Sequence, residues 1–530
     1  MTRLDRIFCA LLFAAVFFVA PASLAAETEG GFTWRWMPVG LQVSTTASDG
    51  ALTMEEVFDA AHEAGLDALI LTDRDVMRWE YGLWPFRRLL KKALEFNSIS
   101  TYGYSNYLRD IEFRSKKYPD LIVIPGAEVA PYYYWSGLPF TRSLKLNDWH
   151  RHILVIGLTD AADLWSMPNV ARPFTVTRGW RWLDVFRLFP FVLIGLGVFL
   201  FFRRECHYKD EKGVECSRFA LRWRITGIAA ALLGILFITN ETSFLPVGYD
   251  QYTRDAGYRP YQALIDYVRG HGGLTFWSHV EAGQSGERDG VRFETAAHPE
   301  AVLAAKGATG FAVFPEGYKL VGKPGGQWDQ ALLEYCRGER ETPVWAVAAM
   351  SFDQGSIEEL LGRMKSTRTY VLGEALNWHD LLEAMRGGRM YATTGGGEEP
   401  LLVGEFSIMD SSTGLRAGPG RETIITGSPV IVLTADKEKT EEEKTAQKEE
   451  RDQAERDRFL KDKGPKDISL TVIRNGEVIK QEMREMPLHF IYVDPQPLTR
   501  KSFYRAVIKR GPQIIATNPI FVQPKEPPTE

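Results

Sequence analysis

Imidazole and carboxylate side chains stand at the ends of short apolar segments in this sequence. Asp49 follows one such segment, Glu128 comes after another, and His152 and His279 flank two more. Glutamate and histidine are residue types that bind Zn²⁺, Mn²⁺ or Fe²⁺. Each fragment alone is unspecific, because a lone histidine at a strand end is more often a hydrogen-bonded packing residue. Their order and spacing together predict a metal-binding site.

The apolar segments have the composition of buried strands. They cover residues 39–45, 68–72, 121–124, 153–157, 274–277, 310–314 and 344–349, with helical stretches between them. Thr53 and Glu56 form a capping box that starts the first helix. Regular alternation of strands and helices predicts parallel strands and a β/α barrel, in which reactive residues lie at the C-terminal ends of the strands.

A second unit is predicted to follow Gly395. Strand-like segments cover residues 429–433, 468–474, 490–493 and 503–509, and Asn475-Gly476 is a strong signal for a hairpin turn. These features predict a C-terminal β-sandwich over residues 396–525. The charged run 436–466 interrupts it and is typical of a solvated helix or a disordered insertion, with partner binding as the alternative.

The first residues are typical of a secretory signal. Arg3 and Arg6 precede an apolar run, and small residues around Ala25 offer a cleavage site. We therefore predict a signal peptide over residues 1–25, with an uncleaved anchor as the alternative.

Two further apolar runs, Leu188–Phe202 and Ile225–Ile238, interrupt the α/β pattern. The loop between them is rich in Arg and Lys, as cytoplasmic loops are, and Trp180 and Trp182 precede the first run. This pattern predicts a transmembrane helical hairpin over residues 187–239, with a cytoplasmic loop and the main domains on the periplasmic side of the cell membrane. A pair of buried core helices is the alternative. The basic and aromatic residues 78–94 predict either a surface helix or a segment lying against anionic headgroups.

Bulk composition restricts the possible partners. The 530 residues carry a formal net charge of −5 with a sequence pI of about 6.1, so we expect no nucleic-acid partner. The chain has 4 cysteines, which do not form a disulfide framework.

The motifs in this order resemble the PHP (polymerase and histidinol phosphatase) family of metal-dependent phosphoesterases. That family carries His-x-His-Thr-x-x-Ser-Asp-Gly, then Thr-Asp-His, Gly-x-Glu, isolated histidines and a final Asp-x-His. Here the frame is present as residues 41–50, Thr72-Asp73-Arg74, Glu128, His152 and His279. The resemblance implies a distorted β/α barrel in two parts, 27–186 and 245–395, interrupted by the hairpin, and a cleft for several metals that cleaves phosphate esters.

Several family ligands are replaced. Gln42 and Ser44 stand where the first motif has its two histidines, and Arg74 replaces another. A guanidinium has no lone pair to offer a cation. Arg74 is therefore predicted to bind an anion, with simple pairing to Asp49 or Asp73 as the alternative.

The surviving residues Glu128, His152 and His279 are similar to most of one family metal site and could hold one divalent metal: Zn, Mn or Fe. His150 lies two residues before His152 and is expected at the surface, with a ligand role as the alternative. Asp49 and Asp353 are the remaining candidates for a catalytic base.

Two functions follow from these residues. The first is a degenerate metallophosphoesterase, in effect a pseudoenzyme, that binds an anionic ligand such as a phosphorylated small molecule, or a protein partner, at the membrane. The alternative is a residual hydrolase that uses a single metal at Glu128, His152 and His279. A scaffold role for the predicted sandwich and its charged insertion is a third, weaker possibility.

Overall fold

A computed structural model describes residues 34–172, 181–209, 211, 213, 215–219, 221–240, 248–252, 254–374, 377–397, 400–437 and 467–525. The predicted signal peptide and nearly all of the predicted charged insertion lie outside these described residues.

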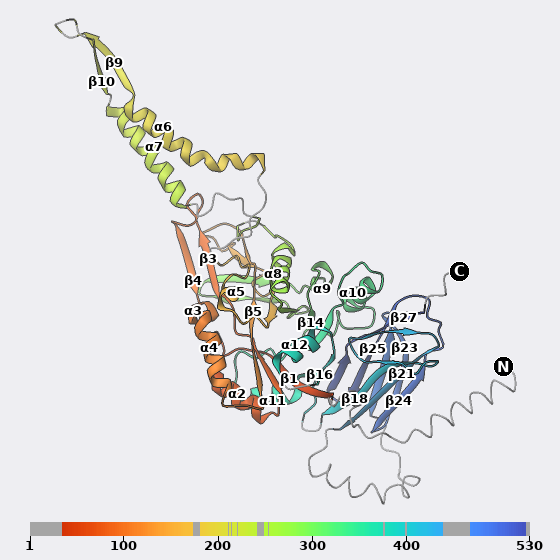
Figure 1. Ribbon diagram of the computed structural model, residues 1–530. Helices are drawn as coiled ribbons and strands as arrows, with labels where there is room; N and C mark the ends of the chain where they lie inside the picture. Colours follow the sequence, from red (N-terminus) through yellow and green to blue (C-terminus); the bar gives the residue numbers. More distant parts are fainter. Residues whose placement is uncertain are drawn as a thin grey trace, which may run out of the picture.

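Strands and helices are interspersed up to residue 394, and the described residues that follow form strands without helices (Figure 1). The helices are α2 (Met54–Glu63), α3 (Ile99–Tyr102), α4 (Tyr104–Ser115), α5 (Ala161–Trp165), η1 (Trp182–Leu188), α6 (Phe189–Phe202), α7 (Leu221–Asn240), α8 (Arg259–Gly270), α9 (Ala301–Ala304), α10 (Gln327–Cys336), α11 (Ile357–Ser366) and α12 (Trp378–Arg386). The predicted capping box of Thr53 and Glu56 is confirmed at the start of α2.

The strands of the N-terminal half are β1 (Arg35–Val43), β2 (Ala68–Leu71), β3 (Arg78–Gly82), β4 (Lys91–Glu95), β5 (Ile122–Val129), β6 (Tyr134–Ser136), β7 (Lys145–Asn147), β8 (Ile153–Ile156), β9 (Arg204–Lys209) and β10 (Glu215–Phe219). Those that follow are β11 (Leu274–Trp277), β12 (Gln284–Arg288), β13 (Val291–Thr295), β14 (Gly310–Phe314), β15 (Trp345–Ala348), β16 (Arg368–Gly373) and β17 (Met390–Thr394). The last group is β18 (Leu401–Asp410), β19 (Arg416–Ala417), β20 (Glu422–Ile425), β21 (Pro429–Lys437), β22 (Ile468–Arg474), β23 (Glu477–Arg484), β24 (Leu488–Val493), β25 (Ser502–Arg510), β26 (Gln513–Thr517) and β27 (Ile520–Pro524).

One large sheet carries the predicted strands in the order β15-β14-β11-β8-β5-β2-β1 and continues into β16 and β17, which were not predicted. Short runs such as Ala68–Leu71 and Leu274–Trp277 are buried at every position, which is why each is apolar throughout. Met350 and Phe352, just beyond β15, donate backbone hydrogen bonds to Leu41 and Gln42 of β1. These bonds connect the segment after β15, at one end of the strand order β15 to β1, with β1 at the other end.

The prediction of parallel strands is wrong at β8, and β16, a further strand that was not predicted, is antiparallel as well. β8 pairs antiparallel with both β5 and β11, and β16 pairs antiparallel with β1. The segment before β8 therefore lies at the same edge of the sheet as the segment after β11. The expectation that Glu128 follows its strand is also wrong, because β5 extends through Val129.

The C-terminal strands form two sheets that share one apolar core. The large sheet continues as β26-β25-β22-β23, and β19-β18-β21-β24 form a separate sheet. Phe406 and Leu433 from the separate sheet join Leu470 and Tyr504 from the large one in this core. The hairpin turn predicted at Asn475-Gly476 is confirmed, because it joins β22 to β23 with positive φ at both residues.

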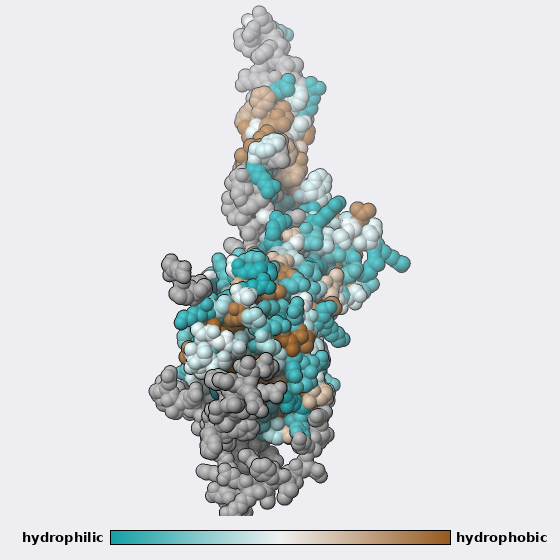
Figure 2. All heavy atoms as spheres, turned by 90° about the vertical axis from the view of Figure 1, so that its right-hand side faces the viewer, coloured by the Kyte–Doolittle hydropathy of each residue, from teal (hydrophilic) through white to brown (hydrophobic). Residues whose placement is uncertain are grey.

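Helices α6 and α7 pack against each other and project away from the body (Figure 1). The segments Asp184–Phe202 and Leu221–Asn240 are long and apolar enough to cross a membrane, by length and composition alone. Only 17% and 11% of their most apolar windows are buried, so the alternative of core helices is wrong. Figure 2 shows apolar side chains gathered along this projection, beyond a more hydrophilic body.

The surface helix considered for residues 78–94 is wrong. This stretch forms the antiparallel hairpin β3–β4. The Trp79 ring is buried and packs edge-on against Phe96 and Trp149. Its neighbours Arg78 and Glu80 are less buried, as expected when successive side chains of a strand point to opposite faces.

Candidate functional site

One edge of the large sheet gathers the predicted site residues. Asp49 follows β1, Arg74 follows β2, and Glu128 lies near the end of β5. Because β8 is antiparallel to its neighbours, His150 and His152 reach this edge by preceding their strand. The other contributors lie beyond the ends of β11, β14 and β15: His279, Glu316, Ser351 and Asp353.

Three histidines form the group within the described residues that could hold a metal ion. One ring nitrogen each from His150, His152 and His279 lies within 4.8 Å of the others. The ring of His150 is half-buried and stacks on His279 with centroids 4.9 Å apart, so the expected surface position is wrong. The spacing of His150 and His152 was a weak signal for this arrangement, because residues two apart in an extended segment point to the same face.

The electrostatics of these rings favour their neutral form. Burial, followed by the positive charge of Arg74, lowers the pKa of His152 to about 4. Burial, together with its two neighbouring imidazoles, lowers the pKa of His150 to about 2. At neutral pH both rings keep a lone pair, which is what a metal requires of an imidazole.

Two carboxylates hold two of the rings by the same nitrogen. The Nδ1 of His152 lies 2.7 Å from Glu128 Oε1, and the Nδ1 of His279 lies 2.5 Å from Glu316 Oε2. When each Nδ1 donates to its carboxylate, the lone pair of each neutral ring is on Nε2. Arg74 NH1 lies 3.1 Å from that atom of His152, and Gln42 Nε2 lies 2.9 Å from that atom of His279. Carboxylate–histidine pairs of this kind orient the histidine ligands of metal sites. Sequence reasoning missed Glu316, although it follows an apolar strand as the other candidates do.

Arg74 is surrounded by acidic groups. Its guanidinium nitrogens lie 3.2 Å from Glu128, 3.3 Å from Asp49 and 3.8 Å from Asp353. The considered pairing with Asp49 is thus present. Asp73 instead accepts hydrogen bonds from the Thr45 amide at 2.7 Å and the Ser48 hydroxyl at 2.6 Å.

The charge balance follows from these contacts. Burial would raise the pKa of Glu128, but the positive charge of Arg74 and the hydrogen bond from His152 outweigh it and hold that pKa well below its usual value. Glu128 is therefore ionised, and it shares the single guanidinium with two further carboxylates. This excess of negative charge favours a bound cation over a bound anion.

Gln42 lies against His279 at the edge of the cluster. Its Nε2 donates to Ser278 Oγ at 2.8 Å and lies 2.9 Å from His279 Nε2, while its buried Oε1 lacks a partner among the described residues. Gln42, His279 and Ser351 all have positive φ, between 53° and 63°. Such backbone strain in non-glycine residues is concentrated at functional sites.

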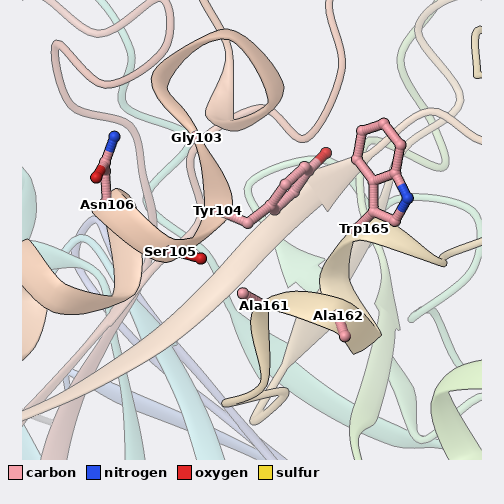
Figure 3. A pocket seen from close by; sticks show the side chains of 7 residues that line it. All are labelled: Gly103, Tyr104, Ser105, Asn106, Ala161, Ala162 and Trp165. Carbon is pink, nitrogen blue, oxygen red and sulfur yellow. The ribbon is translucent and has the colours of Figure 1, made fainter.

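A separate surface pocket lies between the start of α4 and α5 (Figure 3). It is lined by Gly103, Tyr104, Ser105, Asn106, Ala161, Ala162 and Trp165, and none of these belongs to the histidine cluster. The Tyr104 hydroxyl donates to the buried carboxylate of Asp75 at 2.8 Å, next in sequence to Arg74. This contact gives Tyr104 a structural role in one wall of the pocket.

Comparisons with known proteins found similarity in structure alone. No protein-family model matches the chain, and no curated protein matches it. A two-domain protein from Bacteroides vulgatus, containing a predicted PHP-like metal-dependent phosphoesterase, is 10% identical, with 91% of this chain and 93% of that chain covered and a TM-score of 0.33.

Two further solved structures cover a smaller share of this chain. An amidohydrolase from Chromobacterium violaceum is 17% identical, with 60% of this chain and 88% of that chain covered and a TM-score of 0.22. A putative metal-dependent phosphoesterase from Bifidobacterium adolescentis is 12% identical, with 59% and 87% covered and a TM-score of 0.25. These three structures are thus described as containing a PHP-like metal-dependent phosphoesterase, as an amidohydrolase and as a metal-dependent phosphoesterase.

Proposed function

We propose that this chain is a membrane-anchored, PHP-like metalloprotein that binds one divalent metal ion through His150, His152 and His279 and acts on a phosphate ester. The observation that carries the proposal is the pair of carboxylate–histidine contacts, Glu128 with His152 and Glu316 with His279. Both contacts involve Nδ1, which leaves the lone pair of each ring on Nε2. Arg74 NH1 lies 3.1 Å from Nε2 of His152 and Gln42 Nε2 lies 2.9 Å from Nε2 of His279, so a bound ion would displace these two donors.

The donor set fits a transition metal. Three imidazoles with an open position are one of the ligand sets of catalytic zinc sites, and Mn²⁺ or Fe²⁺ is also compatible with imidazole and carboxylate ligands. A bound ion would supply Lewis-acid charge to the oxygens of a phosphate ester. Glu128 and Glu316 hold the imidazoles in place, and Asp49 and Asp353 are candidate proton acceptors at the same edge.

The proposal includes the arrangement around the site. The bonds from Met350 and Phe352 to β1 support a distorted β/α barrel, and the core shared by the two C-terminal sheets supports a β-sandwich. The basic residues between α6 and α7 support a cytoplasmic loop, with the body on the periplasmic side.

Metal analysis of the full chain in detergent tests the proposal. After incubation with Zn²⁺, Mn²⁺ or Fe²⁺ and removal of free ion, we expect about one ion per chain. His150→Ala, His152→Ala and His279→Ala should each lose it. His62→Ala, an exposed histidine on α2, is the matched control and should keep it.

Each result has a distinct meaning. Metal that is lost in all three variants, with metal-dependent hydrolysis of an aryl phosphate, supports the proposal in full. Metal binding without hydrolysis of any phosphate ester rejects the enzyme and leaves a metal-dependent binding protein. Absence of metal from the parent protein rejects the histidine site altogether.

A second candidate is the degenerate protein that binds an anionic ligand or partner without turnover. One observation favours it: the Arg74 NH1 lies 3.1 Å from His152 Nε2 and 3.2 Å from Glu128, so a guanidinium already contacts two of the family ligand positions. Calorimetric titration with inorganic phosphate tests it. Binding that Arg74→Met abolishes in metal-free protein supports this candidate, and absence of binding removes it.

A further inference from the structure

The tip of the β3–β4 hairpin, residues 83–90, exposes a row of large apolar side chains. Trp84 is 80% exposed, Leu89 47% and Leu90 55%. Isolated exposed apolar residues are normal on soluble surfaces, but a tryptophan and two leucines gathered on one turn mark an interaction surface.

The tip is attached to the end of a candidate membrane span. Asn240, the last residue of α7, accepts a hydrogen bond from the Arg88 amide at 2.9 Å and donates one to the Pro85 carbonyl at 3.2 Å. The Phe86 ring packs on Phe237 of α7 with centroids 5.0 Å apart. The tip therefore lies level with the point where α7 ends, as Figure 1 shows for the upper ends of β3 and β4.

Other side chains at this level have the character of a membrane interface. Trp182 and Phe186 of η1, just before α6, are 79% and 69% exposed, and the Phe189 ring lies 5.7 Å from Phe237. Aromatic side chains are enriched where a membrane-spanning helix meets the headgroups.

The tip is also basic. Residues 83–92 contain Arg87, Arg88, Lys91 and Lys92 and no acidic residue. The Arg87 guanidinium lies 4.0 Å from the centre of the Tyr252 ring, and Lys91 pairs with Glu80 at 2.9 Å. Arg88 and Lys92 flank the exposed apolar side chains, and basic residues at this depth are attracted to anionic lipid.

We propose that the β3–β4 tip is an interfacial anchor that inserts Trp84, Leu89 and Leu90 into the headgroup region of a bilayer containing anionic lipid. This inference rests on the proposed membrane anchoring by α6 and α7, and it adds a third contact from the body itself. A contact made by the body itself restricts its tilting against the membrane, which a helical hairpin alone would permit.

Lipid quenching of fluorescent labels tests this anchor. The four natural cysteines are replaced by alanine, and single cysteines are introduced by Leu89→Cys, Phe113→Cys or Leu196→Cys. Phe113 on α4 is 74% exposed and is the matched control, while Leu196 on α6 reports on the helical hairpin. Each full-length protein is labelled, checked for an unchanged melting temperature and placed in vesicles whose acyl chains carry bromine.

We expect the label at position 89 to be quenched several-fold more than the label at 113, and more strongly in vesicles with anionic lipid than in neutral ones. Arg88→Gln with Lys92→Gln should remove that dependence on lipid charge. If the label at 196 is quenched and the label at 89 is quenched no more than the label at 113, the tip anchor is wrong and membrane insertion of the helical hairpin is still supported. If the label at 196 is not quenched, both the membrane hairpin and the tip anchor are wrong. If the label at 89 is quenched equally in anionic and neutral vesicles, the requirement for anionic lipid is wrong.

Discussion

At the scale of single residues, His279 is contacted on both sides of its ring. Its Nδ1 meets Glu316, and its Nε2 faces Gln42 at 2.9 Å and Ser351 Oγ at 3.3 Å. An imidazole held this way loses little rotational freedom on binding an ion, although an ion on Nε2 must displace Gln42 and Ser351.

Glu316→Gln should weaken metal binding while leaving the fold intact. Because an orienting carboxylate raises the basicity of its histidine, we expect the metal dissociation constant to rise roughly 10- to 100-fold. Competition with a chromogenic chelator measures this change. Glu287→Gln, an exposed carboxylate on β12, is the control. An unchanged dissociation constant in Glu316→Gln would contradict a role for Glu316 in orienting His279.

Among single elements, the turn after β18 depends on one buried carboxylate. Asp410 is 1% exposed and accepts hydrogen bonds from the amides of Ser412, Thr426 and Gly427 at 2.9 to 3.0 Å. Burial would raise its pKa, but hydrogen bonds from Thr426, Ser412 and Gly427 outweigh that effect and hold the pKa below its usual value of 3.8.

The pH dependence of this turn follows from that direction. A carboxyl whose pKa is lower in the folded than in the unfolded chain stabilises the fold above about pH 4, and this contribution is lost as pH falls through the folded pKa. Asp410→Ala should therefore lower the free energy of unfolding by roughly 2–3 kcal/mol at neutral pH. The difference in free energy of unfolding between the parent protein and Asp410→Ala should become smaller as the pH falls below about 4.

Thermal unfolding of the parent protein and the variant between pH 7 and pH 3 measures this difference. Asp120→Ala changes an exposed carboxylate and should match the parent at every pH. A deficit of the same size across the range would mean that the Asp410 contacts do not depend on its charge.

The strands of the first unit were predictable because most of them are short apolar runs that are buried at every position. Their directions were not, since Ile153–Ile156 is as apolar as its parallel neighbours and carries no mark of its antiparallel pairing. The β-hairpin at residues 78–95 was not predicted. Trp79 of β3 is buried and Lys91 and Lys92 of β4 are exposed, a mixture of apolar and basic side chains that also fits a surface helix.

The residues of the candidate site could also be predicted only in part. Glu128, His152 and His279 were predictable from their order along the chain, and the sheet brings them together. His150 and Glu316 were not, because their roles depend on the stacking of His150 on His279 and on the contact between β11 and β14, which bring together residues far apart in sequence.

For the whole molecule, one buried ion pair joins the two units. Arg505 of β25 binds Asp329 of α10 through two contacts of 2.6 and 2.7 Å, and both side chains are at most 1% exposed. The same guanidinium lies 4.5 Å from the centre of the Trp328 ring. A pair this deep is sensitive to the loss of one partner, because the other charge is left buried and unpaired.

Arg505→Met should destabilise the protein by roughly 3–5 kcal/mol, and adding Asp329→Leu should recover most of that loss. Denaturant unfolding with intrinsic fluorescence measures both variants. Arg416→Met, which breaks an exposed pair with Glu405, is the control and should change the free energy of unfolding by less than about 1 kcal/mol. A double variant as unstable as the single one would show that the pair itself, rather than the unpaired charge, matters.

The antiparallel strand β8 and its neighbour β11 lie side by side, yet the whole of α6 and α7 separates them along the chain. A ribosome therefore completes His150 and His152 long before His279. A nascent chain released after α6 holds two imidazoles of the cluster and lacks the third. Closing so long a loop delays the pairing of β8 with β11. The proposed metal site would thus form late in biogenesis, and bound metal would report that synthesis and folding of this half of the protein are complete.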